Sequence, residues 1–268
     1  MKIALTANPR IPGTVELCSD ILKKIGPSHQ VVLEKEIAER LGKPGLLLQD
    51  VPADLVLAVG GDGTILRAFQ LGDAKVFGIN SGSLGFLAEI YGEEVTTYLP
   101  RVLRGDYRVE ERMRLRVEVE GRRLVDCLNE AVVHTAHVSK IRAFEIRVDD
   151  QVADKVRADG VILATPTGST SYAMSVGGPI IDPRVDAIIA AAIAPFRRST
   201  RPVVFPPTSW VEVRLTKQKE CLLVLDGQVE VPLAGTESIR VTRSERPARF
   251  IRFRDDFYQR IEQKLAKP

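Results

Sequence analysis

The chain has 268 residues, of which 44% are hydrophobic and 27% charged, and its formal net charge is +3. This composition is typical of a globular protein with one large domain or two smaller ones, and so small a charge does not indicate a nucleic-acid partner. No apolar run approaches membrane-spanning length, and the three cysteines, Cys18, Cys127 and Cys221, are too far apart for a disulfide framework or a cysteine zinc site. This use of cysteine fits a reducing compartment, so we expect the protein in the cytoplasm. His134 and His137 stand three residues apart without a neighbouring cysteine, so we assign no metal site to the protein.

Short apolar strands alternate with helical segments over the first hundred residues. Strands are expected at residues 3–5, 31–33, 54–59 and 75–79. Helices are expected at residues 15–25, in the charged segment that follows the second strand and ends at residue 41, and at residues 64–71. The run at 54–59 is almost uninterrupted, as in a parallel strand that is buried on both faces. This order predicts an α/β domain over residues 1–105, with an open, mostly parallel sheet covered by helices.

The periodicity changes to two from about Arg112. Apolar and polar residues alternate around 113–120 and 144–149, and turn signals recur at 120–121, 149–150 and 226–227. We therefore expect residues 106–250 to form an all-β, largely antiparallel domain. The tail at 255–265 is again helical, and we expect the segment 251–268 to pack back on the α/β domain. The apolar residues on one side of this helix are Phe257, Tyr258, Ile261 and Leu265.

A glycine-rich loop, VGGDGTIL at residues 59–66, joins a buried strand to a helix. Free N–H groups at a helix start attract anions, and glycines let phosphate oxygens approach the backbone. We expect a phosphate loop made of Gly60, Gly61, Gly63 and Thr64. Thr64 is the expected N-cap of the helix. A plain strand-to-helix turn, with the aspartate bonded to the backbone, fits this loop alone equally well.

Asp62 stands at the centre of the loop. The lysine of a P-loop and the third glycine of the dinucleotide fingerprint are both missing. A carboxylate here either accepts the proton of an attacking hydroxyl or holds a divalent cation that bridges phosphates. A general base contributes ~10²–10⁴-fold in rate. Both roles imply phosphoryl transfer, so Asp62 points to a kinase.

Two more polar stretches follow apolar strands. NSGSLGFL at residues 80–87 lies at the carboxyl edge of the predicted sheet, where open α/β sheets bind ligands. ADGVILATPTGSTSY at residues 158–172 places a block of hydroxyl residues after a buried strand. Its hydroxyl and N–H groups suit phosphate and ribose, and Tyr172 offers a ring face to a base. Each stretch alone also fits an ordinary polar loop.

Together these motifs resemble the bacterial NAD kinases. The resemblance follows, in chain order, Gly60-Gly61-Asp62-Gly63-Thr64, Asn80-x-Gly82-x-Leu84-Gly85-Phe86-Leu87, Asn129-Glu130, Asp159-Gly160, Thr165-Pro166-Thr167-Gly168-Ser169-Thr170-x-Tyr172, Gly177-Gly178-Pro179 and Asp226-Gly227-Gln228. The first motif is shared with diacylglycerol, sphingosine and phosphofructo-kinase relatives. The Asn-Glu pair and the Thr/Ser block narrow the resemblance to NAD kinases, and the motifs span nearly the whole chain.

This resemblance implies an activity and its participants. The terminal phosphate of ATP, or of polyphosphate, would pass to the adenosine 2′-hydroxyl of NAD, with Asp62 as general base. A divalent cation, Mg²⁺, would lie on the donor phosphates. The β domain would form most of the NAD site, and the protein would be a homo-oligomer, either a dimer or a tetramer.

The resemblance also implies which residues contact NAD. Asn129 and Glu130 would bond the adenosine part, whereas Arg157 and Asp159 would lie near the nicotinamide end. The full set is Asp62, Gly63, Arg67, Asn129, Glu130, Lys140, Arg157, Asp159, Thr167, Thr170, Ser171, Tyr172, Ser175 and Gln228. Ser171 stands where alanine is common in the family, and Lys140 occupies a variable position. The segment 195–199 lacks the His-Ser-Leu that often follows its proline.

Two other functions remain open. A lipid kinase of the diacylglycerol or sphingosine type, built on the same scaffold, would have a broad apolar cleft and no need of Asn129 and Glu130. A dinucleotide sensor would bind NAD or NADP without chemistry. The carboxylate of Asp62 favours an enzyme, because a pure binder gains nothing from a negative charge that faces phosphate.

Overall fold

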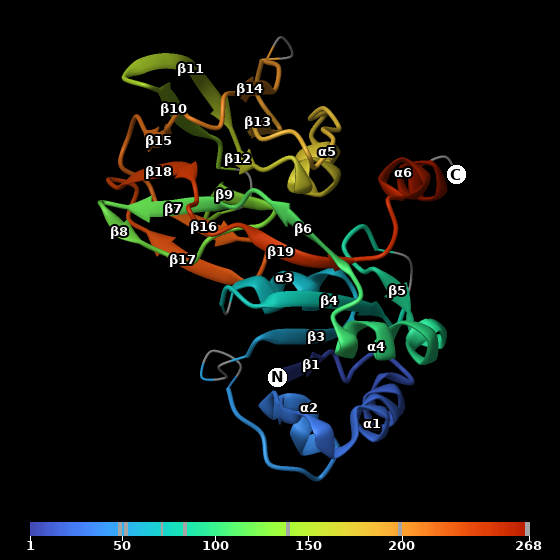
Figure 1. Cartoon of the computed structure of the whole chain (residues 1–268). Helices are drawn as coiled ribbons and strands as arrows, with labels where there is room; N and C mark the ends of the chain where they lie inside the picture. Colours follow the sequence, from blue (N-terminus) through green and yellow to red (C-terminus); the bar gives the residue numbers. More distant parts are fainter. Residues whose placement is uncertain are drawn as a thin grey trace. The chain divides into compact units, whose positions relative to one another are not determined.

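Figure 1 shows the computed structural model of the chain, in which residues 1–47, 50, 53–70, 72–82, 85–137, 140–197 and 200–265 are described. The chain forms two compact units, one of Met1–Glu111 with Ala248–Pro268 and one of Arg112–Pro247. Leu71, at the end of a predicted helix, and Ser83 and Leu84, in the second glycine-rich stretch, lie outside the described residues.

The first unit is an α/β structure. Within its described residues the sheet has the strand order β2-β1-β3-β4-β19-β6, and β5 pairs with β4. Its strands are β1 (Lys2–Ala7), β2 (Gln30–Leu33), β3 (Leu55–Gly60), β4 (Lys75–Asn80), β5 (Ile90–Tyr91), β6 (Arg108–Arg112) and β19 (Ala248–Arg252), and its helices are α1 (Thr14–Ile25), α2 (Lys35–Arg40), α3 (Asp62–Gln70), α4 (Val95–Arg104) and α6 (Phe257–Leu265).

The strands around β3 are parallel, as the apolar run at 54–59 predicts. β1 pairs in parallel with β2 and β3, and β4 pairs in parallel with β3, β5 and β19. Every residue of β3 is buried. Residues of α1, α2 and α4 share one apolar cluster with these strands. The α/β prediction for this part of the chain is therefore confirmed.

Helix α3 begins earlier than the sequence predicts. The expected N-cap, Thr64, is the third residue of a helix that starts at Asp62. The carbonyl of Gly61 already accepts the Thr64 N–H at 3.0 Å, so the first helical turn forms before Thr64. The Thr64 hydroxyl lies instead where a side chain on Gly60 would be, 2.4 Å from the position of such a Cβ.

Helix α6 buries only part of its predicted apolar side. Tyr258 is 63% exposed and Leu265 43% exposed, whereas Arg260 is buried. The Arg260 guanidinium donates to the carbonyl oxygens of Gly85 and Ala88, and its Nε donates to Asp256 at 2.8 Å. The helix is therefore held by a buried cation that bonds to backbone carbonyls, and of its four apolar residues Phe257 and Ile261 are half-buried.

The second unit consists of two antiparallel sheets. Among its described residues the strand orders are β11-β10-β15-β18-β7-β8 and β14-β13-β12-β9-β16-β17. Its elements are β7 (Leu115–Val119), β8 (Arg122–Arg123), β9 (Glu130–Thr135), β10 (Arg142–Val148), β11 (Gln151–Ala158), β12 (Gly160–Ala164), α5 (Tyr172–Ser175), β13 (Ile188–Ile193), β14 (Val203–Phe205), β15 (Val211–Leu215), β16 (Cys221–Leu225), β17 (Val229–Leu233) and β18 (Ser238–Arg243).

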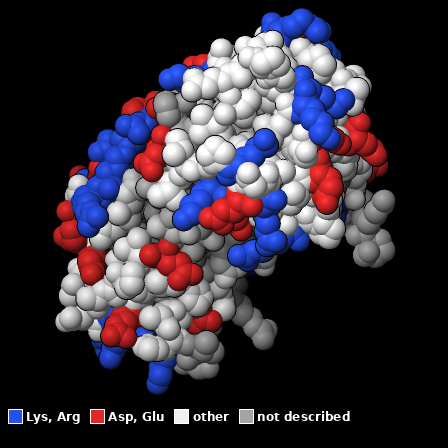
Figure 2. Space-filling view, turned by 90° about the horizontal axis from the view of Figure 1, so that it is seen from below, with Lys and Arg blue, Asp and Glu red and all other residues white. Residues whose placement is uncertain are grey.

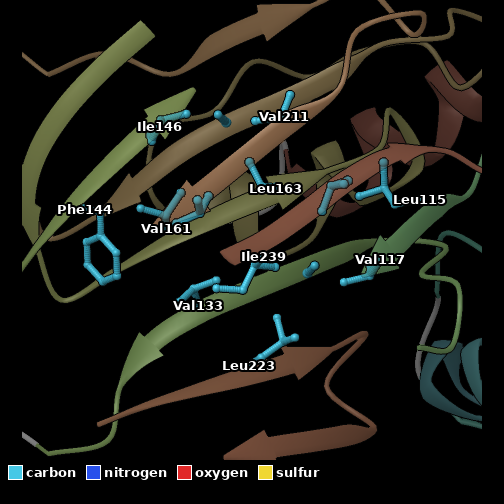
Figure 3. Packing of buried hydrophobic residues seen from close by; sticks show 14 of the residues in the cluster. Leu115, Val117, Val133, Phe144, Ile146, Val161, Leu163, Val211, Leu223 and Ile239 are labelled. Carbon is cyan, nitrogen blue, oxygen red and sulfur yellow. The ribbon is translucent and has the colours of Figure 1, made fainter. Parts of the chain in front are cut away.

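One apolar cluster joins these two sheets. Leu115 and Ile239 come from the first sheet, and Val133, Leu163 and Leu223 come from the second (Figure 3). In β7 and β18 these residues alternate with polar ones, which is the period-two pattern of the sequence, whereas β9, β12 and β16 also bear apolar residues on their other face. The three predicted turns, at 120–121, 149–150 and 226–227, adopt left-handed backbone conformations. The prediction of a largely antiparallel β structure is confirmed.

Charged side chains of both signs are mixed on the surface. Figure 2 shows Lys and Arg close to Asp and Glu on the face in view. Arg123, for example, pairs with the exposed Glu245. Such a surface fits the small net charge of +3.

Candidate active site

Three neighbouring strands of the first unit end at one edge of the sheet. β1, β3 and β4 are parallel, so the segments that follow them meet at their carboxyl ends. The Asn8 N–H donates to the Val59 carbonyl at 3.0 Å, and the Ser81 N–H donates to the Gly60 carbonyl at 3.3 Å. Both glycine-rich stretches of this unit therefore begin at the same edge.

The first stretch leads directly into α3. Gly60 has no room for a side chain, because Thr64 occupies that space. Gly61 is half-buried and Gly63 is exposed. The first N–H groups of a helix have no partner within the helix, and its dipole favours anions. The start of α3 is therefore suited to an anion.

Asp62 joins the two glycine-rich stretches. Its Oδ2 accepts the Phe86 N–H at 2.8 Å and its Oδ1 accepts the Leu87 N–H at 3.1 Å. Gly85 lies so close that a Cβ there would be 2.0 Å from Oδ1. A carboxylate has about four lone-pair sites, so two donors fix its orientation and leave acceptor capacity for a ligand. The aspartate bonds to the backbone and remains half-buried next to the helix start.

Arg67 makes its contacts within the first unit. Its guanidinium pairs with Glu34 at 2.7 Å and with Glu36 at 3.6 Å, and it donates to the Thr6 hydroxyl at 3.2 Å. Among the described residues its buried Nε has no hydrogen-bond partner. Sequence reasoning missed Glu34, because nothing in the pattern links the end of β2 to α3.

In the second unit, the Asn-Glu pair adjoins the Thr/Ser block. Glu130 begins β9, which pairs with β12, the strand that leads into the block. The Thr165 N–H donates to the Asn129 carbonyl at 2.8 Å, and a Cβ on Gly168 would be 2.2 Å from the same oxygen. The Ser171 hydroxyl donates to Glu130 Oε1 at 3.3 Å. Because Gly168 has no side chain, its backbone can lie this close to the Asn129 carbonyl.

Two side-chain oxygens of this pair are buried and unbonded. Within the described part of the chain, Asn129 Oδ1 and Glu130 Oε2 have no hydrogen-bond partner. Both residues are 7% exposed. An unsatisfied buried polar group costs about 1–3 kcal/mol. A ligand with hydrogen-bond donors would remove that cost, so the pair is suited to binding one.

Burial and a neighbouring buried carboxyl group together set the protonation state of Glu130. Burial, and after it the charge of Asp226, raise the pKa of Glu130 to about 8, although the hydrogen bond from the Ser171 hydroxyl lowers it. Burial raises the pKa of Asp226 only to about 6, because three backbone N–H groups favour its charged form. At neutral pH Glu130 therefore keeps a proton while Asp226 is ionised, and the protonated carboxyl can both donate and accept.

Some hydroxyl groups in the rest of the Thr/Ser block donate hydrogen bonds to nearby backbone carbonyls. Thr167 and Thr170 lie on a 3₁₀ turn, where the Thr170 hydroxyl donates to the Thr167 carbonyl at 3.3 Å. The Ser175 hydroxyl donates to the Tyr172 carbonyl at 2.8 Å. The Tyr172 side chain is 39% exposed. The ring of Tyr172 is thus open to stacking beside the buried Asn-Glu pair.

Not all predicted NAD contacts lie together. Gln228 is exposed in the turn after β16, whose Leu225 pairs with Ala131 next to the Asn-Glu pair. Arg157, Asp159 and Lys140 lie towards the other end of β12. That strand pairs Ala164 with Glu130 but Gly160 with His134, four residues away, or about 13 Å in an extended strand.

Arg157 is already in contact with an aromatic ring. Its guanidinium lies 5.1 Å from the ring centre of Phe196. Arg157 and Lys140 are exposed, and Asp159 is half-buried. The structure thus separates a cluster around Asn129 from a second group about Arg157.

Sequence reasoning assigned no contact to Asp226. Asp226-Gly227 reads as a hairpin turn, and both residues do have left-handed φ values of 50° and 64°. Its carboxylate, however, is buried and accepts the N–H groups of Leu128, Asn129 and Glu130. No local signal distinguishes a turn aspartate in water from one that faces a distant segment.

Comparison with known proteins matches the whole chain. The family model of the ATP-NAD kinase N-terminal domain matches residues 19–107, and that of the ATP-NAD kinase C-terminal domain matches residues 128–253. An NAD kinase from Thermoplasma volcanium is 40% identical over 268 residues, which is 100% of this chain and 98% of that protein.

Solved structures have the same fold. A yeast NADH kinase complexed with NADH has a TM-score of 0.89 at 24% identity, covering 99% of this chain and 87% of its own. An NAD kinase from Archaeoglobus fulgidus in complex with ATP has a TM-score of 0.78 at 30% identity, covering 99% and 98%. With both domain models and a full-length relative in agreement with the motifs, the chain belongs to the NAD kinase family.

Proposed function

We propose that this protein transfers the terminal phosphate of ATP to the adenosine 2′-hydroxyl of NAD, giving NADP and ADP, with Asp62 as the general base. The observation that carries the proposal is the carboxylate of Asp62, which is fixed by two backbone donors beside the start of α3. A carboxylate at a phosphate loop needs a chemical role, because it repels the phosphate that the loop would otherwise attract.

The proposed step is an in-line displacement at the terminal phosphorus. The oxygen of the 2′-hydroxyl forms a new bond to phosphorus, the bond from phosphorus to the bridging oxygen breaks, and ADP leaves with that electron pair. The hydroxyl proton passes to the free lone pairs of Asp62. The N–H groups of Gly61 and Gly63 stabilise the charge of the phosphoryl group in transfer.

NAD is bound mainly by the second unit in this proposal. Asn129 Oδ1 and Glu130 Oε2, which are buried and unbonded among the described residues, bond the adenosine part. Tyr172 stacks on a ring, and Arg157 and Asp159 contact the nicotinamide end. The other proposed contacts are Gly63, Arg67, Lys140, Thr167, Thr170, Ser171, Ser175 and Gln228.

The donor carries its own cation in this mechanism. Among the described residues no three His, Cys, Asp or Glu side chains are grouped to hold a metal ion. Mg²⁺ needs only one or two carboxylates when phosphates and water supply its other ligands. We propose that Mg²⁺ enters with ATP and that Asp62 is the one protein carboxylate near it. Polyphosphate would use the same N–H groups as ATP.

Assembly and location form a further part of the proposal. We propose a cytoplasmic homo-oligomer, either a dimer or a tetramer. Val203 and Val204, on a strand at the end of the sheet order, are 43% and 46% exposed, and Phe196 is 66% exposed. Light scattering of the purified protein tests the assembly, and a monomer would contradict it.

The proposed location concerns the cysteines. The described cysteines are buried and not disulfide-bonded, which fits a reducing compartment. None of the described helices combines the length and apolar character needed to cross a bilayer.

A direct assay separates this function from its alternatives. The protein is incubated with NAD, ATP and Mg²⁺, and NADP is measured. We expect NADP to form, and no product from a diacylglycerol. Tight NADP binding without product formation would identify a sensor, and product from the lipid alone would identify a lipid kinase.

The role of Asp62 has its own test. We expect Asp62→Asn to lose turnover by ~10²–10⁴-fold, because the amide cannot take the proton. NAD affinity should change little, since the amide keeps the size of the side chain. Turnover and NAD binding are measured on the same preparation. An unchanged kcat would remove Asp62 from the role of base.

A further inference from the structure

Asp226 makes an unusual set of bonds to three consecutive residues. Its Oδ2 accepts the Leu128 N–H at 2.7 Å, and its Oδ1 accepts the Asn129 and Glu130 N–H groups at 2.8 and 3.0 Å. The Asp226 N–H in turn donates to the Glu130 carbonyl at 2.9 Å. Asp226 is only 4% exposed, and it belongs to a different segment of the chain.

These bonds impose a specific backbone shape. In a regular strand, successive N–H groups point to opposite sides. Three successive N–H groups that converge on one carboxylate require a bend, and residues 128 and 129 do form a bend immediately before β9 begins at Glu130. Such a concavity of backbone N–H groups is an anion site, which the Asp226 carboxylate fills from within the protein.

The other side of the same bend is also fixed. The Thr165 hydroxyl donates to the Leu128 carbonyl at 2.5 Å, and the Thr165 N–H donates to the Asn129 carbonyl at 2.8 Å. The backbone of the Asn-Glu pair is thus saturated by protein partners on both sides. Asn129 Oδ1 and Glu130 Oε2, in contrast, have no partner among the described residues. The bend therefore fixes the backbone from which these two side-chain oxygens, with their unused hydrogen-bonding capacity, project.

We propose that Asp226 is a positioning residue of the NAD site, which holds the bend that presents Asn129 Oδ1 and Glu130 Oε2 to the nucleotide without itself touching it. The inference rests on the proposed NAD contacts of Asn129 and Glu130. It adds a residue that acts through both of them.

The negative charge of Asp226 gives the residue a second effect. Burial is the largest cause of the raised pKa of Glu130, and the charge of Asp226 is the second largest. The other ionisable groups around the pair are Arg114, which donates to the Asp126 carbonyl at 3.2 Å, and Asp126, which pairs with Arg123. The buried Cys127 thiol has a raised pKa and is neutral. A neutral Glu130 faces the anionic dinucleotide without repulsion, so NAD should bind best to the protonated form.

The test is the dissociation constant of NAD measured by calorimetry without ATP, over a range of pH. For the wild type we expect affinity to fall as the pH rises through about 8, the value to which burial and Asp226 raise the pKa of Glu130. For Asp226→Asn we expect about 10–100-fold weaker binding, because an amide offers one acceptor oxygen and points donors at N–H groups. The pH of the fall should also move downwards, because the neighbouring charge is gone.

A second variant and a control make the result specific. Asp226→Glu keeps the charge but displaces the carboxylate, so it should weaken binding and leave the pH of the fall near that of the wild type. Asp149→Asn changes another turn aspartate with left-handed φ, whose carboxylate accepts the Ser209 hydroxyl and the Trp210 N–H. This control should leave NAD affinity and its pH dependence unchanged.

The outcomes are distinct. Wild-type affinity and pH dependence in Asp226→Asn would overturn the inference, as would failure of both Asp226 variants to fold in thermal melts, since Asp226 would then be a folding residue. An equal effect of Asp149→Asn would also overturn it. A wild type that neither binds NAD nor forms NADP from NAD and ATP would instead refute the proposed function.

Discussion

Replacing Gly85 by alanine should displace the proposed base without changing any atom of it. The added Cβ would lie 2.0 Å from Asp62 Oδ1, 2.7 Å from Cγ and 3.0 Å from Oδ2. Unbonded heavy atoms meet at about 3.5 Å, so the nearer oxygen has to move by about 1.5 Å. The hydrogen bonds from Phe86 and Leu87, now 2.8 and 3.1 Å long, would be lost or strongly bent.

The expected effect on the two measurable quantities differs. A misplacement of about 1 Å in a reacting group lowers the rate by about 10²-fold, so kcat for NADP formation should fall by at least that factor. Stability should fall by only about 1–3 kcal/mol, because Asp62 is half-buried and water replaces the lost donors. The assay is steady-state NADP formation at saturating NAD and ATP, together with a thermal melt.

Two further variants decide the interpretation. Gly72→Ala is the matched control, because a Cβ at Gly72 meets nothing within 4 Å, and it should keep the wild-type kcat. In the double variant Asp62→Asn with Gly85→Ala, the second change should add little, since both act on one group. The reasoning is refuted if Gly85→Ala keeps the wild-type kcat. It is also refuted if kcat of the double variant falls by the full factor of Gly85→Ala on top of the factor of Asp62→Asn.

Two other predictions concern buried ionisable groups. Between about pH 4.5 and about 8 the unfolded chain releases the Glu130 proton while the folded protein keeps it, so this group makes stability fall as the pH rises, by about 1.4 kcal/mol per pH unit at most. Urea unfolding at both ends of this range should show a smaller fall in Glu130→Gln, and parallel curves for the two proteins would contradict the buried, raised pKa. Burial also raises the pKa of the Cys18 thiol to about 12 and that of Cys127 well above its usual value. An aromatic disulfide reagent at mildly alkaline pH should therefore label the folded protein slowly and the urea-unfolded protein quickly, and rapid labelling of all three thiols in the folded state would show that they are accessible.

The sequence predicts the elements of this fold well where a repeated pattern is present. The unbroken apolar run of β3 and the alternation around β7 and β10 each follow from one physical rule, burial on two faces or on one. The start of α3 was misplaced by two residues, because the glycines and Thr64 are compatible with either register. Only the hydrogen bond to the Gly61 carbonyl settles it.

The parts that could not be predicted depend on contacts between remote segments. Arg260 is an ordinary surface residue in a helical pattern, and its burial follows from the carbonyl oxygens of Gly85 and Ala88, about 170 residues away in the chain. Asp226 and Glu34 are similar cases. The candidate site itself was found by motif, whereas the groups that hold its side chains in place required the three-dimensional structure.

The position of β19 has a consequence for how the protein is made. This strand lies between β4 and β6 in the sheet of the first unit, although it is encoded after the whole of the second unit. During synthesis the second unit can complete its two sheets as soon as residue 247 has emerged. The first unit must meanwhile wait with the part of β4 that β19 covers, around Val76, unpaired, and an unpaired strand edge is prone to wrong pairing and aggregation. The ribosome thus delivers the chain in an order in which the second unit can fold before the first, whose sheet is completed only when β19 has emerged.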